Sequence, residues 1–432
     1  MATLPSISED MSYDSESSFE EQECGRRRAE KAALLAAAIF CAENRRKHKA
    51  PPKTRSANKK RNRKDSVDIL MEGVNDGHLK DEYRMSKESL LKPHSLLKPD
   101  LHVSIRNRRG DVIDSLSKVM MSLRYLAGSR WVDVVRIHGV SKPAVFRCIR
   151  QVLRAVNKHP LVGKPKFPTD EVEAEQYAQE WARLSGPPGG RRGALSRCIG
   201  AIDGIIIKTR SPSKNETVRV TDFYSGHKKT VGLNVQVVCD AKKRILFLSV
   251  LCPGKTNDLV AYESSKIASL IEGLPEGYYA VGDNAYVNSN HLLVPFPGKL
   301  SNADPRDAFN FYLSQLRVRV ENCFALLVGR WGIFWGPLKM PLRYQPMVIK
   351  AVCCLHNFCI DEGDVKPDRS PHRTRYSAEV AETDEEGRLI DPAWRTQYQF
   401  QRNVACASLR DDLVSFIASE GLVRPPTSRP RT

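Results

Sequence analysis

The segment Ile199-Gly-Ala-Ile-Asp203-Gly-Ile-Ile-Ile207 places a single acidic residue in a run of β-branched and small apolar side chains. Such a run is typical of a buried β-strand, where a carboxylate without a partner is costly. An acid in this position is therefore expected to have a positively charged partner nearby, such as a basic side chain or a metal ion. We predict a strand over residues 199–209 that opens a folded domain and carries Asp203 as a functional residue.

The sequence after this strand predicts a mixed α/β domain over residues 196–361. Segments 230–240 and 244–251 have the pattern of strands, and the tight turn Asp240-Ala-Lys-Lys243 joins them into a hairpin. Three strands, a helix, a strand and a helix is the order of a ribonuclease-H-like core, with a mixed sheet flanked by helices. The later elements are expected over 259–271 (helix), 278–283 (strand) and 308–328 (helix).

Three further acids stand where an acid is locally unexpected. Asp258 closes Pro253-Gly-Lys-Thr-Asn-Asp258, Asp283 lies in Val281-Gly-Asp283-Asn-Ala-Tyr286, and Glu321 lies at the margin of an apolar stripe on the last helix. Each acid alone is explained as a turn residue, a helix cap or an exposed side chain. The stripe consists of Leu313, Leu316, Val320, Phe324, Leu327 and Trp331.

Taken together, the acids indicate a metal site. Phosphodiester cleavage uses two divalent ions, one on the attacking oxygen and one on the leaving oxygen. Mg²⁺ prefers carboxylate and water oxygens, so the protein contributes a cluster of acids on rigid elements. Asp203 on a strand, Asp258 before a helix and Glu321 inside a helix can meet at one sheet.

Residues 67–165 predict an all-α domain with a helix-turn-helix. A short amphipathic helix begins at Trp131, Gly139 makes the turn, and Ser141 caps a second helix that has Val145, Ile149 and Val152 on one face. The alternative is an ordinary helical hairpin with a solvated basic face. In the DNA-binding interpretation, the exposed side of the second helix presents Lys142, Arg147 and Arg150.

The charge balance favours a polyanionic partner. The chain has 68 Lys plus Arg against 50 Asp plus Glu, a net charge of +18, so nucleic acid is the expected partner. No apolar run approaches the roughly 18 residues that span a bilayer, so no membrane association is expected. The start of the chain does not resemble a secretion signal, which predicts a cytosolic or nuclear protein.

The two ends and the segment between the domains are expected to lack a packed core. Residues 1–66 form an N-terminal arm whose basic run, 45–64, is a nuclear import signal, a phosphate-binding arm or merely a solubilising tail. Residues 166–195 are a linker with a short helix, and 362–432 are a tail with one docking helix near 404–419. The candidate DNA contacts of the arm are Lys59, Lys60, Arg61, Arg63 and Lys64.

The eleven cysteines predict reduced core residues rather than a disulfide or metal framework, because no Cys-x-x-Cys pair occurs. The densest group is Cys353-Cys354-Leu-His356-Asn-Phe-Cys359. Zinc binding is an alternative for this group, but the surrounding residues have the pattern of a buried helix.

Several blocks of the sequence resemble the PIF/Harbinger transposases and their domesticated relatives, whose nuclease domain belongs to the DDE superfamily. Within residues 83–360 these blocks are Tyr83-Arg-Met-Ser86, Leu123-Arg-Tyr-Leu-Ala127, Gly139-Val-Ser141, Gly200-Ala-Ile-Asp203-Gly204, Leu233-Asn-Val-Gln-Val-Val-Cys-Asp240, Cys252-Pro-Gly-Lys-Thr-Asn-Asp258, Gly282-Asp283-Asn-Ala-Tyr286, Arg319-Val-Glu321-Asn-Cys-Phe324 and Cys354-Leu-His-Asn357.

The resemblance implies a metal-dependent DNA transposase or nuclease that cleaves phosphodiester bonds and transfers 3′ ends. Asp203, Asp258 and Glu321 would be the catalytic triad and hold Mg²⁺, or Mn²⁺ in its place, with Asp283 as a further metal-binding acid. The implied partners are double-stranded DNA and a separate Myb-like DNA-binding protein, and self-association stays open. The implied location is the nucleus, or the cytoplasm without that partner.

The sequence departs from the family at residues beside the acids. Ile205-Ile206 follows the first block where relatives have Thr-His, Asn257 replaces a His, and Asn322 replaces an Arg. A domesticated derivative that binds DNA or a protein without cutting is therefore an alternative. A host nuclease acting on RNA is a third interpretation, since a basic surface attracts either polymer.

Overall fold

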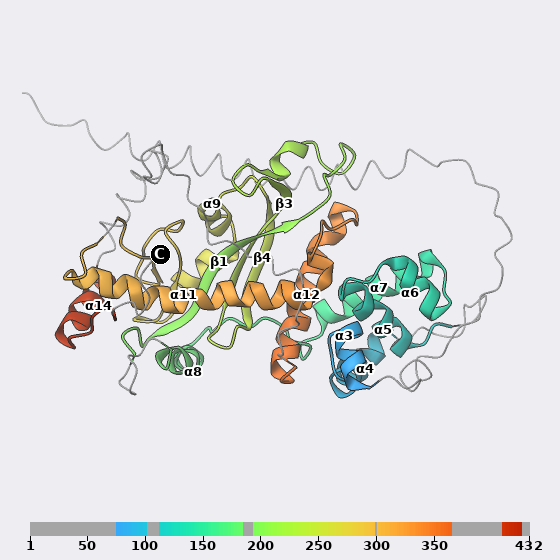
Figure 1. Cartoon of the computed structure of the whole chain (residues 1–432), viewed down its shortest axis with the longest axis horizontal. Coiled ribbons are helices and arrows are strands. Elements are labelled where there is room, and N and C mark those ends of the chain that lie inside the picture. The colour runs from blue at the N-terminus through green and yellow to red at the C-terminus, as the bar shows by residue number, and fades with distance from the viewer. Residues whose placement is uncertain (1–74, 102–111, 185–192, 299, 365–407, 426–432) are drawn as a thin grey trace, which may run out of the picture. The chain divides into compact units, whose positions relative to one another are not determined.

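The computed structural model describes residues 75–101, 112–184, 193–298, 300–364 and 408–425 (Figure 1). The basic run at 45–64, with its candidate DNA contacts, lies outside the described residues. The elements below belong to one compact unit, formed by Lys60–Ser211 and Thr221–Thr432. In the described ranges, no helix is both long enough and apolar enough to cross a membrane.

The first part of this unit is a layer of helices. It contains α3 (Asp76–Tyr83), α4 (Lys87–Leu101), α5 (Ser115–Leu126), α6 (Trp131–His138) and α7 (Lys142–Lys158). Gly139, at a φ of 60°, ends α6 in the left-handed conformation that glycine adopts easily. The predicted apolar face of α7 is buried, but Ser141 caps α7 by position only, without a side-chain hydrogen bond.

The centre of the unit is a mixed sheet, as predicted. Its strands are β1 (Cys198–Lys208), β2 (Tyr224–Ser225), β3 (Thr230–Cys239), β4 (Ile245–Pro253), β5 (Tyr279–Val281) and β6 (Leu292–Leu293). β3 pairs antiparallel with β1, β2 and β4, whereas β5 pairs parallel with β1 and with β6. The predicted hairpin is present, with Arg244 donating its backbone N–H to Asp240 Oδ1 at 2.7 Å.

Helices cover both faces of the sheet (Figure 1). α11 (Pro305–Arg330) packs on β1 and β3, and its predicted apolar stripe is buried. α9 (Asp258–Glu263) and α10 (Lys266–Glu272) build a second core on the other face, around Ile202 and Val238. α8 (Glu171–Ala182), which the sequence places in the linker, packs against β1.

The predicted helix over 259–271 is in fact two helices. Ser265 caps α10 by accepting a hydrogen bond from the Ile267 N–H, and its hydroxyl donates to the Tyr262 carbonyl at 2.8 Å. Serine side chains compete in this way with the backbone bonds that would continue a helix. The periodicity of the apolar residues carries through the break, which is why the sequence suggested one helix.

α12 (Gln345–Asp361) holds the outer edge of the sheet through two adjacent residues. His356 Nε2 lies 3.0 Å from the Lys243 carbonyl oxygen, and Asn357 bonds both the N–H and the carbonyl of Ile245, at 2.7 and 2.8 Å. Cys353, Cys354 and Cys359 are buried. Since no metal-binding group of three such side chains occurs among the described residues, the zinc alternative has no support there.

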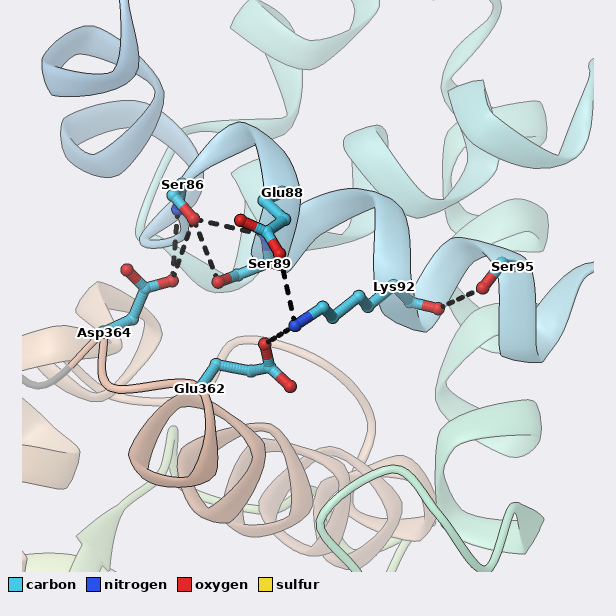
Figure 2. Close-up of polar contacts among 7 residues, drawn as sticks. All are labelled: Ser86, Glu88, Ser89, Lys92, Ser95, Glu362 and Asp364. Atoms are coloured by element: carbon cyan, nitrogen blue, oxygen red, sulfur yellow. Dashed lines mark hydrogen bonds and ion pairs between the residues drawn. The ribbon is translucent and has the colours of Figure 1, made fainter.

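The C-terminal end of α12 also joins the helical layer (Figure 2). The Asp364 carboxylate accepts a hydrogen bond from the Ser86 N–H at 3.2 Å, and Glu362 pairs with Lys92 of α4. On the same helix, the Met347 carbonyl accepts from the Asn157 side chain of α7 at 2.9 Å. One helix therefore contacts both the sheet and the helical layer.

The expected C-terminal docking helix is present as α14 (Ser408–Ser419), which packs on α11. Ile417 is fully buried, and the Arg410 guanidinium lies 4.0 Å from the centre of the Phe296 ring.

Candidate active site

Asp203 lies in the middle of β1, opposite Val237 of β3. Alternation along the strand puts its side chain on the face that buries Ala201 and Ile205 and is covered by α11. The next backbone N–H, of Gly204, donates to Asp203 Oδ1 at 2.7 Å. The carboxyl is therefore fixed on a rigid element, at a partly accessible position.

The structure brings two more of the predicted acids to Asp203. Burial raises the pKa of the Asp203 carboxyl well above its usual range, the negative charges of Asp283 and then Asp258 raise it further, and Arg317 opposes them. Such effects require short separations, because charge interactions weaken with distance and with solvent screening. Asp258 and Asp283, from distant parts of the sequence, thus lie close enough to Asp203 for their charges to act on its carboxyl.

Asp258 is the first residue of α9 and lies close to the β1 backbone. A Cβ atom added at Gly204 would lie only 2.1 Å from Asp258 Oδ1, so the site requires glycine after Asp203. The preceding residue, Asn257, caps α9 by accepting a hydrogen bond from the Val260 N–H at 2.8 Å. The replacement of the family's histidine by Asn257 therefore has a structural role.

Three residues that the sequence did not indicate as site residues surround Asp258. Asn234 and Gln236 of β3 donate side-chain hydrogen bonds to Asp258 Oδ1 at 2.9 and 2.7 Å, and the Tyr286 hydroxyl donates to Gln236 Oε1 at 2.6 Å. Burial, followed by the charges of Asp258, Asp203 and Asp283, raises the pKa of the Tyr286 phenol. The available signal was the pair of polar residues, two apart, in an otherwise apolar strand.

Asp283 follows β5 in a tight turn. Its Oδ1 accepts the Ala285 N–H at 2.8 Å, and its carbonyl accepts the Tyr286 N–H at 3.2 Å. A Cβ at Gly282 would lie 2.9 Å from the Tyr286 ring, so glycine is needed where this turn begins. The short block from Gly282 to Tyr286 thus contributes an acid and a buried hydroxyl to the same region.

Glu321 is less closely engaged than the aspartates. It lies on the exposed side of α11 and pairs with Arg317, one turn earlier, at 3.4 Å. The positive charge of the same Arg317 also lowers the pKa of Asp203, so this one residue interacts with both acids.

The donor chemistry of the site fits a hard divalent cation. The negatively charged atoms that could bind a metal here are all carboxylate oxygens. A bound cation would offset the repulsion that Asp283 and Asp258 exert on Asp203. As arranged, however, no three His, Cys, Asp or Glu side chains in the described ranges form a group that could hold a metal ion. The donors fit in kind, but they are not gathered into one coordination set.

Comparison with known proteins relates this region of the chain to a nuclease family. Residues 202–357 match a family model described as a DDE superfamily endonuclease, from the strand of Asp203 to the helix of Asn357. This chain carries a DDE superfamily endonuclease domain. The resemblance to the Harbinger family is confirmed, and the mixed sheet flanked by helices is consistent with a ribonuclease-H-like DDE fold.

Two curated proteins are similar to this chain. "Protein ALP1-like" from Arabidopsis thaliana is 25% identical over 311 residues, which cover 67% of this chain and 72% of that protein. "Putative nuclease HARBI1" from Xenopus laevis is 23% identical over 262 residues, 58% of this chain and 70% of that protein. No solved structure matches this chain significantly.

The other residues at which the endonuclease domain departs from its family have different surroundings. Ile205 is buried in the core beneath α11, so its apolar character is required there. Asn322 is exposed beside Glu321.

The candidate DNA-binding residues of α7 are not equally accessible. Lys142 and Arg147 are exposed, and the Lys142 ammonium lies 4.3 Å from the centre of the Trp131 ring. Arg150 is only partly exposed, and its guanidinium lies 5.5 Å from the ring of Tyr344, which Arg343 also contacts. Of the three predicted residues, Arg150 is therefore the least accessible.

Because its carboxyl is buried and is also repelled by two acids, Asp203 should destabilise the metal-free fold. Its folded pKa is raised, so this penalty is absent below the usual pKa of 3.8 and grows as the pH rises towards the folded value. We predict that Asp203→Asn, which retains an oxygen to accept the Gly204 N–H, stabilises the metal-free chain at pH 7. The gain in unfolding free energy should exceed the ~0.5 kcal/mol typical of surface changes.

Urea unfolding of both chains in a metal chelator, between pH 4 and pH 8, measures this effect. The difference should widen with rising pH, whereas Asp412→Asn on the exposed side of α14 should show no such trend. A constant or reversed difference for Asp203→Asn would show that the folded chain does not disfavour the charged form of Asp203.

Proposed function

We propose that the endonuclease domain cuts phosphodiester bonds of double-stranded DNA and transfers the freed 3′ ends, on a ribonuclease-H-like scaffold. The observation that carries this proposal is the convergence of Asp258 and Asp283 on Asp203, which is reflected in the raised pKa of that carboxyl. Clustering of like charges on rigid elements is costly for stability and is typical of functional sites. The domain match and the name of the Xenopus relative support the same reaction class.

In this proposal Asp203 and Asp258 hold a divalent cation, Mg²⁺ or Mn²⁺, with Asp283 and Glu321 as further oxygen donors. When bound, such ions activate the attacking oxygen and stabilise the leaving oxygen. The chain's own residues position the donors: the Gly204 N–H orients Asp203, and two side-chain amides orient Asp258. Arg317, close to Asp203 and Glu321, supplies a positive charge beside the site.

The DNA duplex would lie along the exposed basic side of α7, in a helix-turn-helix arrangement of α6 and α7. Lys142 and Arg147 support this, together with the absence of any acid between Asp133 and Asp170. Such contacts act mainly on phosphates and position the duplex without reading its sequence. A nuclear location, a Myb-like partner and self-association belong to the same proposal and rest on the family resemblance.

A second candidate function is binding without cutting. The pairing of Glu321 with Arg317, and the lack of a three-donor metal group among the described residues, favour it. This derivative binds DNA or a protein. Its DNA-binding form shares DNA binding with the first candidate, so cleavage distinguishes the two functions.

Cleavage should depend on the acids and on added Mg²⁺ or Mn²⁺. With duplex DNA as the substrate, we expect Asp203→Asn and Asp258→Asn to slow nicking at least about a hundredfold, since removal of one charge-stabilising group costs that much. Asp412→Asn should nick at the wild-type rate. Undiminished nicking by Asp203→Asn would refute the assignment, and DNA binding without nicking by the wild type would favour the second candidate.

DNA affinity should depend on the basic side of α7. Replacing Arg147 by Glu removes one phosphate contact and adds a repulsive charge, so the affinity should fall and its dependence on salt should lessen by about one counterion. Fluorescence anisotropy over a range of salt concentrations measures both quantities. Lys266→Glu, an exposed change on α10, is the matched control, and equal effects of the two substitutions would refute a specific role for α7.

A further inference from the structure

The residues beneath Asp258 form a buried polar chain in an otherwise apolar layer. Asn234 and Gln236 lie two apart on β3, so both face the side of the sheet covered by α9, where only 3% and 1% of them are exposed. The neighbours on this side include Ile202, Val238 and Leu246. Amides in such a layer are destabilising unless their hydrogen-bonding groups are satisfied.

The donors of both amides are fully used. Gln236 Nε2 donates to Asp258 Oδ1 at 2.7 Å and to Asn234 Oδ1 at 2.9 Å. Asn234 Nδ2 donates to Asp258 Oδ1 and to the Thr256 carbonyl, each at 2.9 Å. Both amides therefore direct their NH₂ groups at the same carboxylate oxygen and leave Asp258 Oδ2 without a bond from either.

Tyr286 fixes the orientation of the amides in this series of hydrogen bonds. Its hydroxyl donates to Gln236 Oε1 at 2.6 Å, and only 1% of the residue is exposed. With its oxygen bonded to this hydroxyl, the Gln236 amide presents its NH₂ group to Asp258. The opposite orientation would bring two oxygens, one of them charged, into contact.

We propose that Tyr286, Gln236 and Asn234 are positioning residues that hold Asp258 in the orientation needed to bind a divalent cation through Oδ2. The inference rests on the proposed function, since it gives Asp258 the role of a metal ligand. It assigns to the tyrosine of the Gly282–Tyr286 block a role separate from that of Asp283. Gly204 belongs to the same arrangement, because a Cβ there would lie 2.1 Å from Asp258 Oδ1 and 2.6 Å from Gln236 Nε2.

The test is a calorimetric titration of the full-length chain with Mn²⁺. Residues that orient metal ligands typically contribute about ten- to hundredfold to metal affinity or activity, so Tyr286→Phe should weaken Mn²⁺ binding about tenfold. Gln236→Leu should weaken it at least as much. Nicking by Tyr286→Phe should require proportionately more Mg²⁺ while its half-saturating DNA concentration stays unchanged.

Tyr279→Phe is the matched control. Tyr279 lies on neighbouring β5 and is also only 1% exposed, and its hydroxyl has no hydrogen-bond partner among the described residues. The same atom is removed from the same depth, so Mn²⁺ affinity should not change. Adding Tyr286→Phe to Gln236→Leu should weaken Mn²⁺ binding no further, because both changes interrupt the same series of hydrogen bonds to Asp258.

The outcomes separate the inference from the function on which it rests. If the wild type binds Mn²⁺ and folded Tyr286→Phe binds it equally well, the inference is wrong and the proposed function stands. If the wild type binds Mn²⁺ but cuts no DNA, the cutting function is wrong and the Mn²⁺ titration still decides the inference. A wild type that neither binds Mn²⁺ nor cuts DNA overturns both.

Discussion

Repulsion among three carboxylates is the constraint around which the endonuclease domain is organised. Asp203 would move away from Asp258 and Asp283 if its backbone were free, because burial and the charges of both neighbours raise the free energy of its charged form. They stay together because β1, β3 and β5 are paired and helices cover both faces of the sheet. Packing energy thus maintains a cluster that is unfavourable by itself, as expected of a site built to bind a positive charge.

One strand serves both faces of the sheet at this point. Asp203 belongs to the face covered by α11, and the next residue, Gly204, leaves space on the opposite face for Asp258 and its amide partners. The Asp203-Gly204 pair therefore provides an acidic side chain and, at the next residue, the space that a missing side chain leaves for Asp258. The two amides and Tyr286 form a support that is buried deeper than the acids themselves.

The parts of the fold that were predictable from the sequence are those with long periodic patterns. β1, the β3–β4 hairpin, α7, α11 and α12 were predictable, since burial on one face leaves a repeating signal. β6 has two residues, too few for a period, and the break between α9 and α10 depends on a single hydroxyl of Ser265. The partners of Asp258 were missed because their contact depends on the register of β3 against β1, which local patterns do not specify.

The most direct test of a shared cation site is anomalous diffraction from crystals of the full-length chain soaked in Mn²⁺. The account predicts an anomalous peak at coordination distance from the carboxylates of Asp203 and Asp258, with the Gln236 amide still bonded to Asp258 Oδ1. A Mn²⁺ peak elsewhere in the molecule, with both carboxylates left unliganded at saturating Mn²⁺, would contradict it.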